Sequence, residues 1–278
     1  MIGCMVRFHD RILRIAHTGI VVALSATVAA CNPHSGGPLP GRASSEWTRS
    51  YAIQPGGEFQ IVGAGGTIDV QGTTNPAIDV KAERVVRAAT DAMATSMAPR
   101  VRISEDVTPD KIVLRSEGLG GITVGADIQV NFHVTVPAGT KLRLRSSNGD
   151  ITMTNVAGTI VASSSNGAII GKVLRGGIDA RATNGSITID MAAMSKDPID
   201  LRATNGTIQL SLPPTANANV EATCTNGTVD FSNLPLQLAG EQTKRRTRGR
   251  LNEGGTPVDL TTTNGDIHLL ASTPGVAP

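Results

Sequence analysis

The chain has 278 residues, with 25 Lys and Arg against 23 Asp and Glu and a formal net charge of +2. This near-balance leaves no basic footprint for nucleic acid, so no nucleic-acid partner is predicted. Only 2% of the residues are aromatic, which argues against a thick globular core built on large rings. Aliphatic residues together with 31 Gly suit a thin, turn-rich β fold.

Residues 1–30 predict a signal peptide. Three Arg precede a mostly apolar stretch that ends in Val28-Ala29-Ala30-Cys31. Small residues mark signal cleavage sites, and a Cys directly after them resembles a bacterial lipobox. The resemblance implies cleavage before Cys31, lipid attachment to that residue and anchoring to a membrane. An ordinary cleaved signal with a chance Cys is the alternative.

The residue after Cys31 is Asn32 rather than Asp. By the same resemblance, this indicates an outer-membrane lipoprotein of the cell envelope, with a secreted or periplasmic protein as the alternative. No other stretch approaches the roughly 18 consecutive apolar residues of a transmembrane helix.

Residues 31–46 are rich in Gly and Pro and predict a lipidated, flexible tether. Residues 47–140 predict N-terminal strands, with a divergent early turn at Gly65-Gly66. Within them, apolar side chains three or four residues apart predict one short helix over 84–98. We expect this helix to cap the open N-terminal end of the repeats that follow.

Residues 141–273 contain six repeats of a small residue, Ser or Thr, Asn, Gly, any residue, and Ile or Val. The Asn residues are spaced 18, 18, 21, 21 and 38 apart. Inward small or aliphatic residues alternate with polar ones on both sides, which predicts a strand, a tight turn and a strand. The predicted turn residues are Asn148, Gly149, Asn166, Gly167, Asn184, Gly185, Asn205, Gly206, Asn226, Gly227, Asn264 and Gly265.

Two all-β architectures fit this pattern. One is a row of antiparallel hairpins, and the other is a parallel β-helix-like solenoid with coils of 18–21 residues. The equal phase of every repeat favours the β-solenoid, because like positions then stack into columns. Stacked Asn side chains would form a hydrogen-bonded ladder. Cys224 falls in an inward column and is predicted to be a buried small residue rather than a reactive thiol.

The stretch KRRTRGR at 244–250 holds five basic residues in seven. It predicts a basic loop over 240–250 that interrupts the solenoid, since such a run is unsuited to a thin apolar core. It is either a solvated loop or a contact with an anionic surface such as lipid or lipopolysaccharide phosphate. The residues of that contact would be Lys244, Arg245, Arg246, Arg248 and Arg250.

The outward acids and arginines do not suggest catalysis. Asp179, Asp200 and Glu221 share one column beside a column of arginines, where opposite charges would pair across the surface. No motif joins these acids to a His or a metal set, so no catalytic, cofactor-binding or metal residues and no cofactor are predicted. A polysaccharide-active β-helix enzyme is the least favoured alternative.

A Ser or Thr precedes each repeat Asn and would form a flat hydroxyl ladder facing solvent. The residues are Ser147, Ser165, Thr183, Thr204, Thr225 and Thr263. Such an array can match a repeating ligand, so the leading hypothesis is a non-enzymatic adhesin or surface-interaction module that binds a glycan or an envelope protein. The alternative is a structural or envelope-stress scaffold that binds a partner protein. Oligomeric state stays open.

The repeated Asn-Gly phrase and the closing GRLNEGGTPVDLTTTNGDIHL (249–269) together resemble the bacterial putative-adhesin family of β-strand-repeat proteins, a domain of unknown function. The resemblance covers about residues 55–270. It implies a right-handed β-solenoid that is secreted or membrane-anchored, and it carries no catalytic residues onto this chain. The basic stretch departs from the family pattern.

Overall fold

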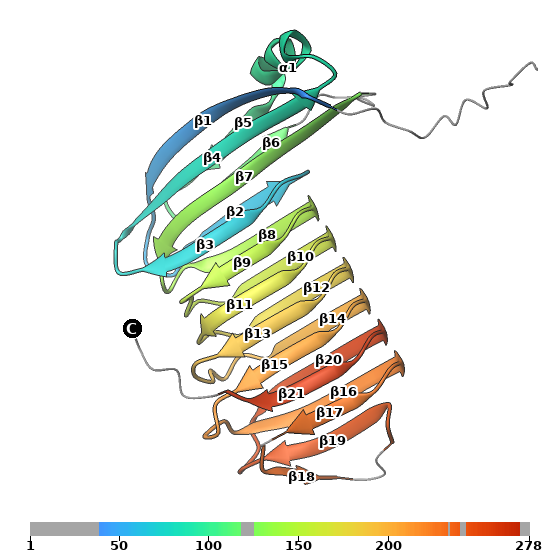
Figure 1. Cartoon of the computed structure of the whole chain (residues 1–278). Helices are drawn as coiled ribbons and strands as arrows, with labels where there is room; N and C mark the ends of the chain where they lie inside the picture. The colour runs from blue at the N-terminus through green and yellow to red at the C-terminus, as the bar shows by residue number, and fades with distance from the viewer. Residues whose placement is uncertain (1–38, 118–124, 233, 240–242, 273–278) are drawn as a thin grey trace, which may run out of the picture. The chain divides into compact units, whose positions relative to one another are not determined.

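The computed structural model describes residues 39–117, 125–232, 234–239 and 243–272. The chain divides into two units, Met1–Gly36 and Gly37–Pro278, and every described residue lies in the second. In this unit two sheets enclose one apolar core (Figure 1). Neighbouring repeats pair as parallel strands, so the predicted β-solenoid is confirmed and the row of antiparallel hairpins is wrong.

One sheet, called sheet A, has ten strands. Their spatial order is β1 (Gly41–Ala52), β4 (Ala77–Ala88), β7 (Ala126–Pro137), β3 (Ile68–Thr73), β9 (Ile151–Thr154), β11 (Ile169–Leu174), β13 (Ile187–Met191), β15 (Ile208–Leu212), β21 (Ile267–Ala271) and β17 (Val229–Ser232).

The other sheet, called sheet B, has eleven strands. Their spatial order is β5 (Arg102–Val107), β6 (Lys111–Glu117), β2 (Glu58–Gly63), β8 (Lys141–Asn148), β10 (Ile160–Asn166), β12 (Ile178–Asn184), β14 (Ile199–Asn205), β20 (Thr256–Asn264), β16 (Ala218–Asn226), β19 (Arg246–Leu251) and β18 (Leu236–Leu238).

Each coil consists of one strand in sheet B, a tight turn and one strand in sheet A. Strand alternation sends every second side chain inward, where Ile151, Ile187 and Leu201 are fully buried. Identical positions then lie opposite each other, as in the pairs Ile160↔Ile178 and Ile187↔Ile208. Burial of these stacked aliphatic columns drives the assembly, and it needs few aromatic residues. The divergent turn at Gly65-Gly66 belongs to such a coil, formed by β2 and β3.

The coils do not stack in sequence order. Strand β20 lies between β14 and β16 and is parallel to both, and β21 likewise lies between β15 and β17. The last repeat of the sequence is therefore the second-to-last coil in space (Figure 1). The register of the Asn turns is preserved at this insertion, with Asn264 opposite both Asn205 and Asn226.

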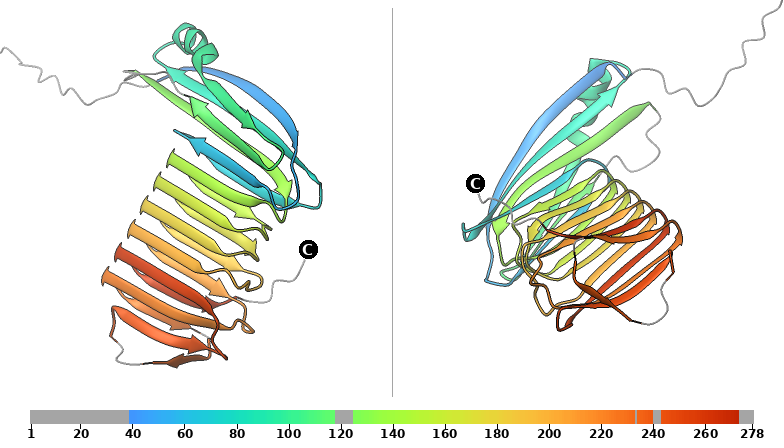
Figure 2. Two further views of the ribbon diagram at one scale, coloured as in Figure 1. Left: turned by 180° about the vertical axis from the view of Figure 1, so that it is seen from behind. Right: turned by 60° about the horizontal axis from the view of Figure 1, so that its bottom comes forward.

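Antiparallel strands close the N-terminal end of the solenoid. Strands β1, β4 and β7 extend sheet A, and β5 pairs antiparallel with β6 in sheet B (Figure 2). The edge strands β1 and β5 are joined where the Tyr51 hydroxyl donates to Glu105 at 2.5 Å. Arg49 stacks on the ring of Trp47 beside this contact, so an aromatic and polar layer covers the core here.

Two predicted boundaries in this region need correction. The helix α1 spans Asp91–Met97, and a 3-10 turn follows at Ala98–Arg100, whereas residues 84–88 continue strand β4. The helix begins only after Thr90, whose hydroxyl accepts a hydrogen bond from the backbone N–H of Met93. Strand β1 already begins at Gly41, so residues 41–46 belong to sheet A rather than to the predicted tether.

The predicted basic loop also needs correction. Residues 246–251 form strand β19, which is antiparallel to both β16 and β18. Thr247, Gly249 and Leu251 point inward, and the intervening arginines point to solvent. A period of two lets a basic segment contribute a strand, because its charges never enter the core.

Candidate functional site

The Asn side chains of the six repeats form one continuous hydrogen-bonded ladder along the turns. In each rung an Nδ2 amide donates to the Oδ1 of the next Asn, as from Asn166 to Asn148 at 2.9 Å. The remaining rungs run from Asn184 to Asn166, Asn205 to Asn184, Asn264 to Asn205 and Asn226 to Asn264, at 2.8–2.9 Å. Amide stacking of this kind needs the in-register parallel strands of the solenoid.

The glycine after each Asn is required by close approach between coils. A Cβ on Gly185 would lie 2.1 Å from the carbonyl oxygen of Gly167, and one on Gly149 would lie 2.1 Å from that of Gly66. Gly149 also has a φ of +139°, which side-chain-bearing residues rarely adopt. The glycines therefore let the coils approach closely enough for the Asn ladder to form.

The position two before each Asn faces the core and holds a small residue. Cys224 occupies it in the coil of β16 and is 3% exposed. Burial raises the pKa of the Cys224 thiol, which disfavours the nucleophilic thiolate. The prediction of a buried structural cysteine agrees with this placement.

The hydroxyl residues before each Asn lie on the outer face of sheet B, and all six side chains are exposed. Within the described part of the chain, none of their hydroxyl groups forms a hydrogen bond to another protein group. The strand spacing sets these hydroxyls about 4.8 Å apart. We call this column and the adjacent Asn ladder the ladder face. Its spatial order is Ser147, Ser165, Thr183, Thr204, Thr263 and Thr225.

The charged columns beside the ladder face are paired within the surface. Arg181 contacts Asp179 at 2.9 Å, and Arg202 makes two hydrogen bonds to Asp200, at 2.7 and 2.8 Å. Both pairs lie two residues apart on one strand, so charges pair along strands as well as across them. These two acids are therefore engaged in surface ion pairs.

The five basic residues of 244–250 differ in their surroundings. Arg246 and Arg248 both bind the carboxylate of Glu221, at 2.7 and 2.8 Å. These contacts, led by the one from Arg248, lower the pKa of Glu221 below its usual range. Arg250 donates to Gln237 at 3.1 Å. Lys244 and Arg245 are exposed, and their side chains make no ion pair within the described residues.

Asp266, in the turn between β20 and β21, caps the neighbouring turn between β16 and β17. Its carboxylate accepts hydrogen bonds from the backbone N–H and the hydroxyl of Thr228, at 2.8 and 3.0 Å. The backbone hydrogen bond is the largest cause of a lowered pKa for Asp266.

A depressed folded-state pKa stabilises the protein above the unfolded value of about 4, and this contribution is lost as the pH falls through the folded pKa. We therefore expect stability to decrease on acidification below pH 4, and to decrease less in Asp266→Asn. Urea unfolding between pH 2 and 6 measures this dependence. An identical pH dependence in the variant would contradict the role of Asp266.

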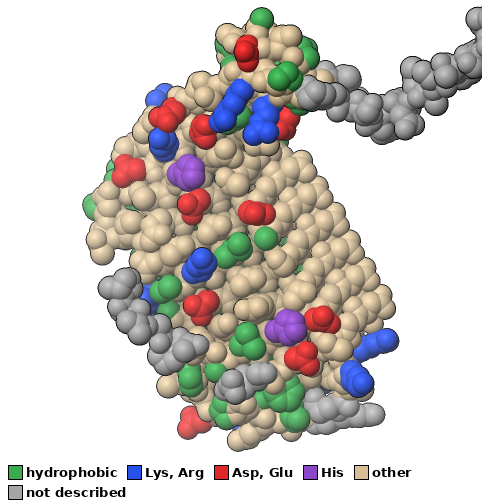
Figure 3. All heavy atoms as spheres, in the orientation of Figure 1, with side chains coloured by type: hydrophobic (Ala, Val, Ile, Leu, Met, Phe, Trp, Pro, Cys, Tyr) green, Lys and Arg blue, Asp and Glu red, His purple; other side chains and the backbone are tan. Residues whose placement is uncertain are grey.

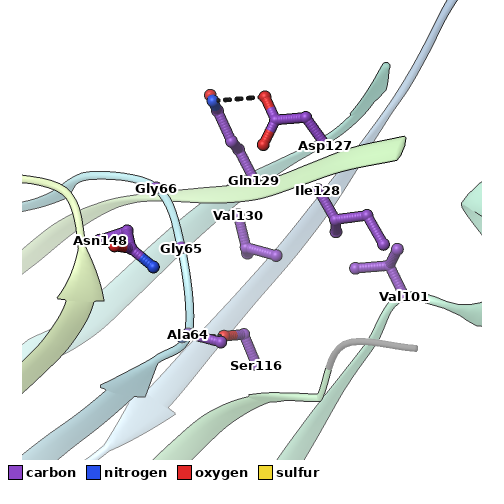
Figure 4. A pocket seen from close by; sticks show the side chains of 10 residues that line it. All are labelled: Ala64, Gly65, Gly66, Val101, Ser116, Asp127, Ile128, Gln129, Val130 and Asn148. Carbon is purple, nitrogen blue, oxygen red and sulfur yellow. Dashed lines mark hydrogen bonds between the residues drawn. The ribbon is translucent and has the colours of Figure 1, made fainter. Parts of the chain in front are cut away.

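One cavity of about 310 Å³ opens where the N-terminal strands meet the first coils (Figure 4). Ile128, Val130 and Val101 line its apolar side, and Asn148 at the end of the amide ladder borders it. The Ser116 hydroxyl accepts a hydrogen bond from the backbone N–H of Ala64, and Asp127 binds Gln129. The described lining contains no nucleophile paired with a base and no two facing carboxylates, so we assign no chemistry to it.

Elsewhere in the described residues, no cluster of three or more His, Cys, Asp and Glu is arranged to hold a metal ion. His133 and His268 each lie 3.7 Å from one carboxylate, of Asp69 and Asp230, on the outer face of sheet A (Figure 3). None of the described helices is long and apolar enough to span a bilayer. The predicted lipid attachment site, Cys31, lies outside the described residues.

Stacked in-register coils, a shared amide ladder and a glycine at every turn define a β-solenoid repeat protein. The chain belongs to the DUF4097 family: the family model described as Toastrack DUF4097 matches residues 126–270. This agrees with the resemblance to β-strand-repeat proteins seen in the sequence. Comparison with curated proteins gives no match.

Three solved structures illustrate what the chain is similar to. A putative cell adhesion protein from Clostridium sporogenes is 11% identical, with a TM-score of 0.48 over 82% of this chain and 100% of that one. A putative adhesin from Bacteroides fragilis is 10% identical, with a TM-score of 0.27 over 82% and 97%. Another, from Parabacteroides distasonis, is 11% identical, with a TM-score of 0.26 over 83% and 98%. None of the three is described as an enzyme.

Proposed function

We propose that this chain is a non-enzymatic binding module of the cell envelope that holds an extended glycan along its ladder face. The observation that carries the proposal is the column of six exposed hydroxyls beside the Asn ladder, none of which has a hydrogen-bond partner among the residues that the structure describes. A hydroxyl both donates and accepts, so a regular row of them suits a polymer that presents hydroxyls at repeated intervals. The paired charges next to it leave the face close to neutral, which suits an uncharged sugar chain.

The isosteric double substitution Thr183→Val and Thr204→Val tests the ladder face. It removes two adjacent hydroxyls while keeping β-branched side chains, so the strands should remain intact. Loss of two hydrogen bonds at about 0.5–1.5 kcal/mol each predicts glycan binding roughly ten-fold weaker. The matched control, Thr152→Val with Thr188→Val, changes two outward threonines of sheet A and should bind as the parent does.

Glycan arrays followed by calorimetry on the best ligand provide the measurement. Equal weakening by both double variants would contradict binding at the ladder face. If no glycan is retained while a specific envelope protein crosslinks to sheet B, the scaffold function is favoured instead.

We further propose that the module is attached to the outer membrane through lipid on Cys31. The proposal is supported by the lipobox-like Val28-Ala29-Ala30-Cys31 and by the position of the first described strand, which begins only ten residues later at Gly41. In a bacterial host, intact mass should show a diacylated chain that starts at Cys31 and partitions into membranes. Cys31→Ala should abolish both properties, and an unlipidated, freely soluble parent protein would contradict the anchor and favour secretion.

A further inference from the structure

The two ends of the solenoid differ in how their apolar core is covered. At the N-terminal end the antiparallel strands and α1 cover the core, whereas at the other end the described residues form no further coil beyond β17, β18 and β19. We call these three strands, with the segments 234–235 and 243–245 that adjoin them, the terminal rung. Phe231 occupies the inward position opposite Leu269, yet it is 39% exposed where Leu269 is 2% exposed.

The apolar residues of the terminal rung form an uncovered layer. Leu238 on β18 is 49% exposed, and Val229, Leu234 and Leu236 are each only partly buried. In the coils before it, the equivalent inward residues are covered by the next coil. This layer thus exposes the end of the core, which is a recognised signature of an interaction surface.

A basic segment adjoins the same layer. The backbone carbonyl of Lys244 accepts a hydrogen bond from the N–H of Val229 at 2.9 Å, which places the start of the basic segment against β17. Arg246 and Arg248 both contact the carboxylate of Glu221, and Asp230 lies beside His268. The cations without an acidic partner among the described residues are Lys244, Arg245 and Arg250.

We propose that the terminal rung docks onto an anionic lipid surface. The exposed Phe231 and Leu238 would enter the interfacial region of the bilayer, and the uncompensated cations would meet lipid phosphates. Adjacent apolar and cationic side chains on one surface are the combination that binds anionic membranes. A protein partner would need no such excess of cations. The proposal uses other side chains than those of the ladder face, so either proposal can fail without the other.

Flotation with vesicles tests the proposal, using phosphatidylcholine alone and phosphatidylcholine mixed with phosphatidylglycerol. Every full-length protein carries Cys31→Ala, so no lipid anchor contributes, and pure phosphatidylcholine gives the baseline set by the rest of the chain. We expect binding above this baseline only with phosphatidylglycerol, decreasing as salt is raised. Lys244→Gln with Arg245→Gln should weaken it about 25-fold, since each cation contributes roughly five-fold.

Two controls distinguish binding by the terminal rung from binding by any exposed cation or apolar side chain. Arg145→Gln with Lys172→Gln removes two exposed cations on other strands and should change binding by less than about two-fold. Phe231→Gln should weaken binding about ten-fold, whereas Val107→Gln, at a 49% exposed residue on β5, should not. Circular dichroism establishes that each variant is folded.

Three results would overturn the proposal. The first is equal binding to both kinds of vesicle, and the second is equal weakening by the two cation variants. The third is a dimer in sedimentation that Phe231→Gln converts to a monomer, because a second copy would then cover the apolar layer.

Discussion

Replacing Gly149 by alanine is expected to lower the free energy of unfolding by about 4 kcal/mol. The added Cβ would lie 2.1 Å from the carbonyl oxygen of Gly66, a backbone atom that can move only if two coils separate. The φ of +139° adds strain, because an alanine side chain is disfavoured in that region. Overpacking accounts for about 1–3 kcal/mol of the loss and the backbone conformation for about 1–2 kcal/mol.

Two other glycines separate these contributions. Gly56 has a φ of +75°, and a Cβ added there would meet nothing within 4 Å, so Gly56→Ala should cost only about 1 kcal/mol. Gly139 has neither a positive φ nor a close neighbour, so Gly139→Ala should be neutral or slightly stabilising. Urea denaturation of the three variants gives the comparison. If both substitutions, at Gly149 and at Gly56, lowered the free energy of unfolding equally, the close approach between coils would not be what makes Gly149 necessary.

Ending the chain after Asn252 is expected to release the last coils from the solenoid. The truncation removes β20 and β21, which lie between the coil of β14–β15 and the coil of β16–β17. Four buried apolar side chains are lost with them: Val258, Leu260, Ile267 and Leu269. At about 1.5 kcal/mol or more each, their removal costs on the order of 6 kcal/mol. Hydrogen exchange should show β16–β19 unprotected while β8–β15 remain protected.

A chain ending after Ser272 is the matched control and should keep full protection, because it retains every strand that the structure describes. A synthetic peptide of residues 253–272 should restore protection of β16–β19 when it is added to the truncated chain. The opposite finding, undiminished protection without the peptide, would mean that β16–β17 moves directly onto β14–β15. That rearrangement would keep the Asn ladder, since Asn226 and Asn205 both pair with Asn264 in the intact chain.

The repeats alone predicted the solenoid, because equal phase requires like residues to stack. Each repeat has a small residue two positions before the Asn, aliphatic residues after it and a glycine at the turn. Each of these features meets one geometric requirement of the stacked coils. The Asn ladder and the outward hydroxyls followed from the same alternation. Cys224 could be placed in the core for this reason, without any knowledge of its neighbours in space.

The order of the coils could not be predicted from the sequence. All six repeats present the same edge to a neighbour, so Asn264 fits on Asn205 as well as Asn226 does. Only the 38-residue spacing between Asn226 and Asn264 indicated that additional structure lies between these two repeats. Strand β19 was not predicted either, because its high charge indicated a loop. Its inward residues are Thr247, Gly249 and Leu251, of which only Leu251 has a large apolar side chain. The terminal rung was missed because Phe231 has the sequence pattern of a core residue, and its exposure depends on the missing next coil.

The interchangeability of the coils has a consequence for how such a chain changes length in evolution. Removing residues 167–184 would join Asn166 directly to Gly185, recreate an intact turn and shorten the protein by one whole coil. A duplication of the same segment would add one. Recombination between repeats therefore alters the length of the ladder face in whole steps while both ends stay unchanged. A lineage can thus adjust the length of the protein and the number of exposed hydroxyls in its ladder without redesigning its core.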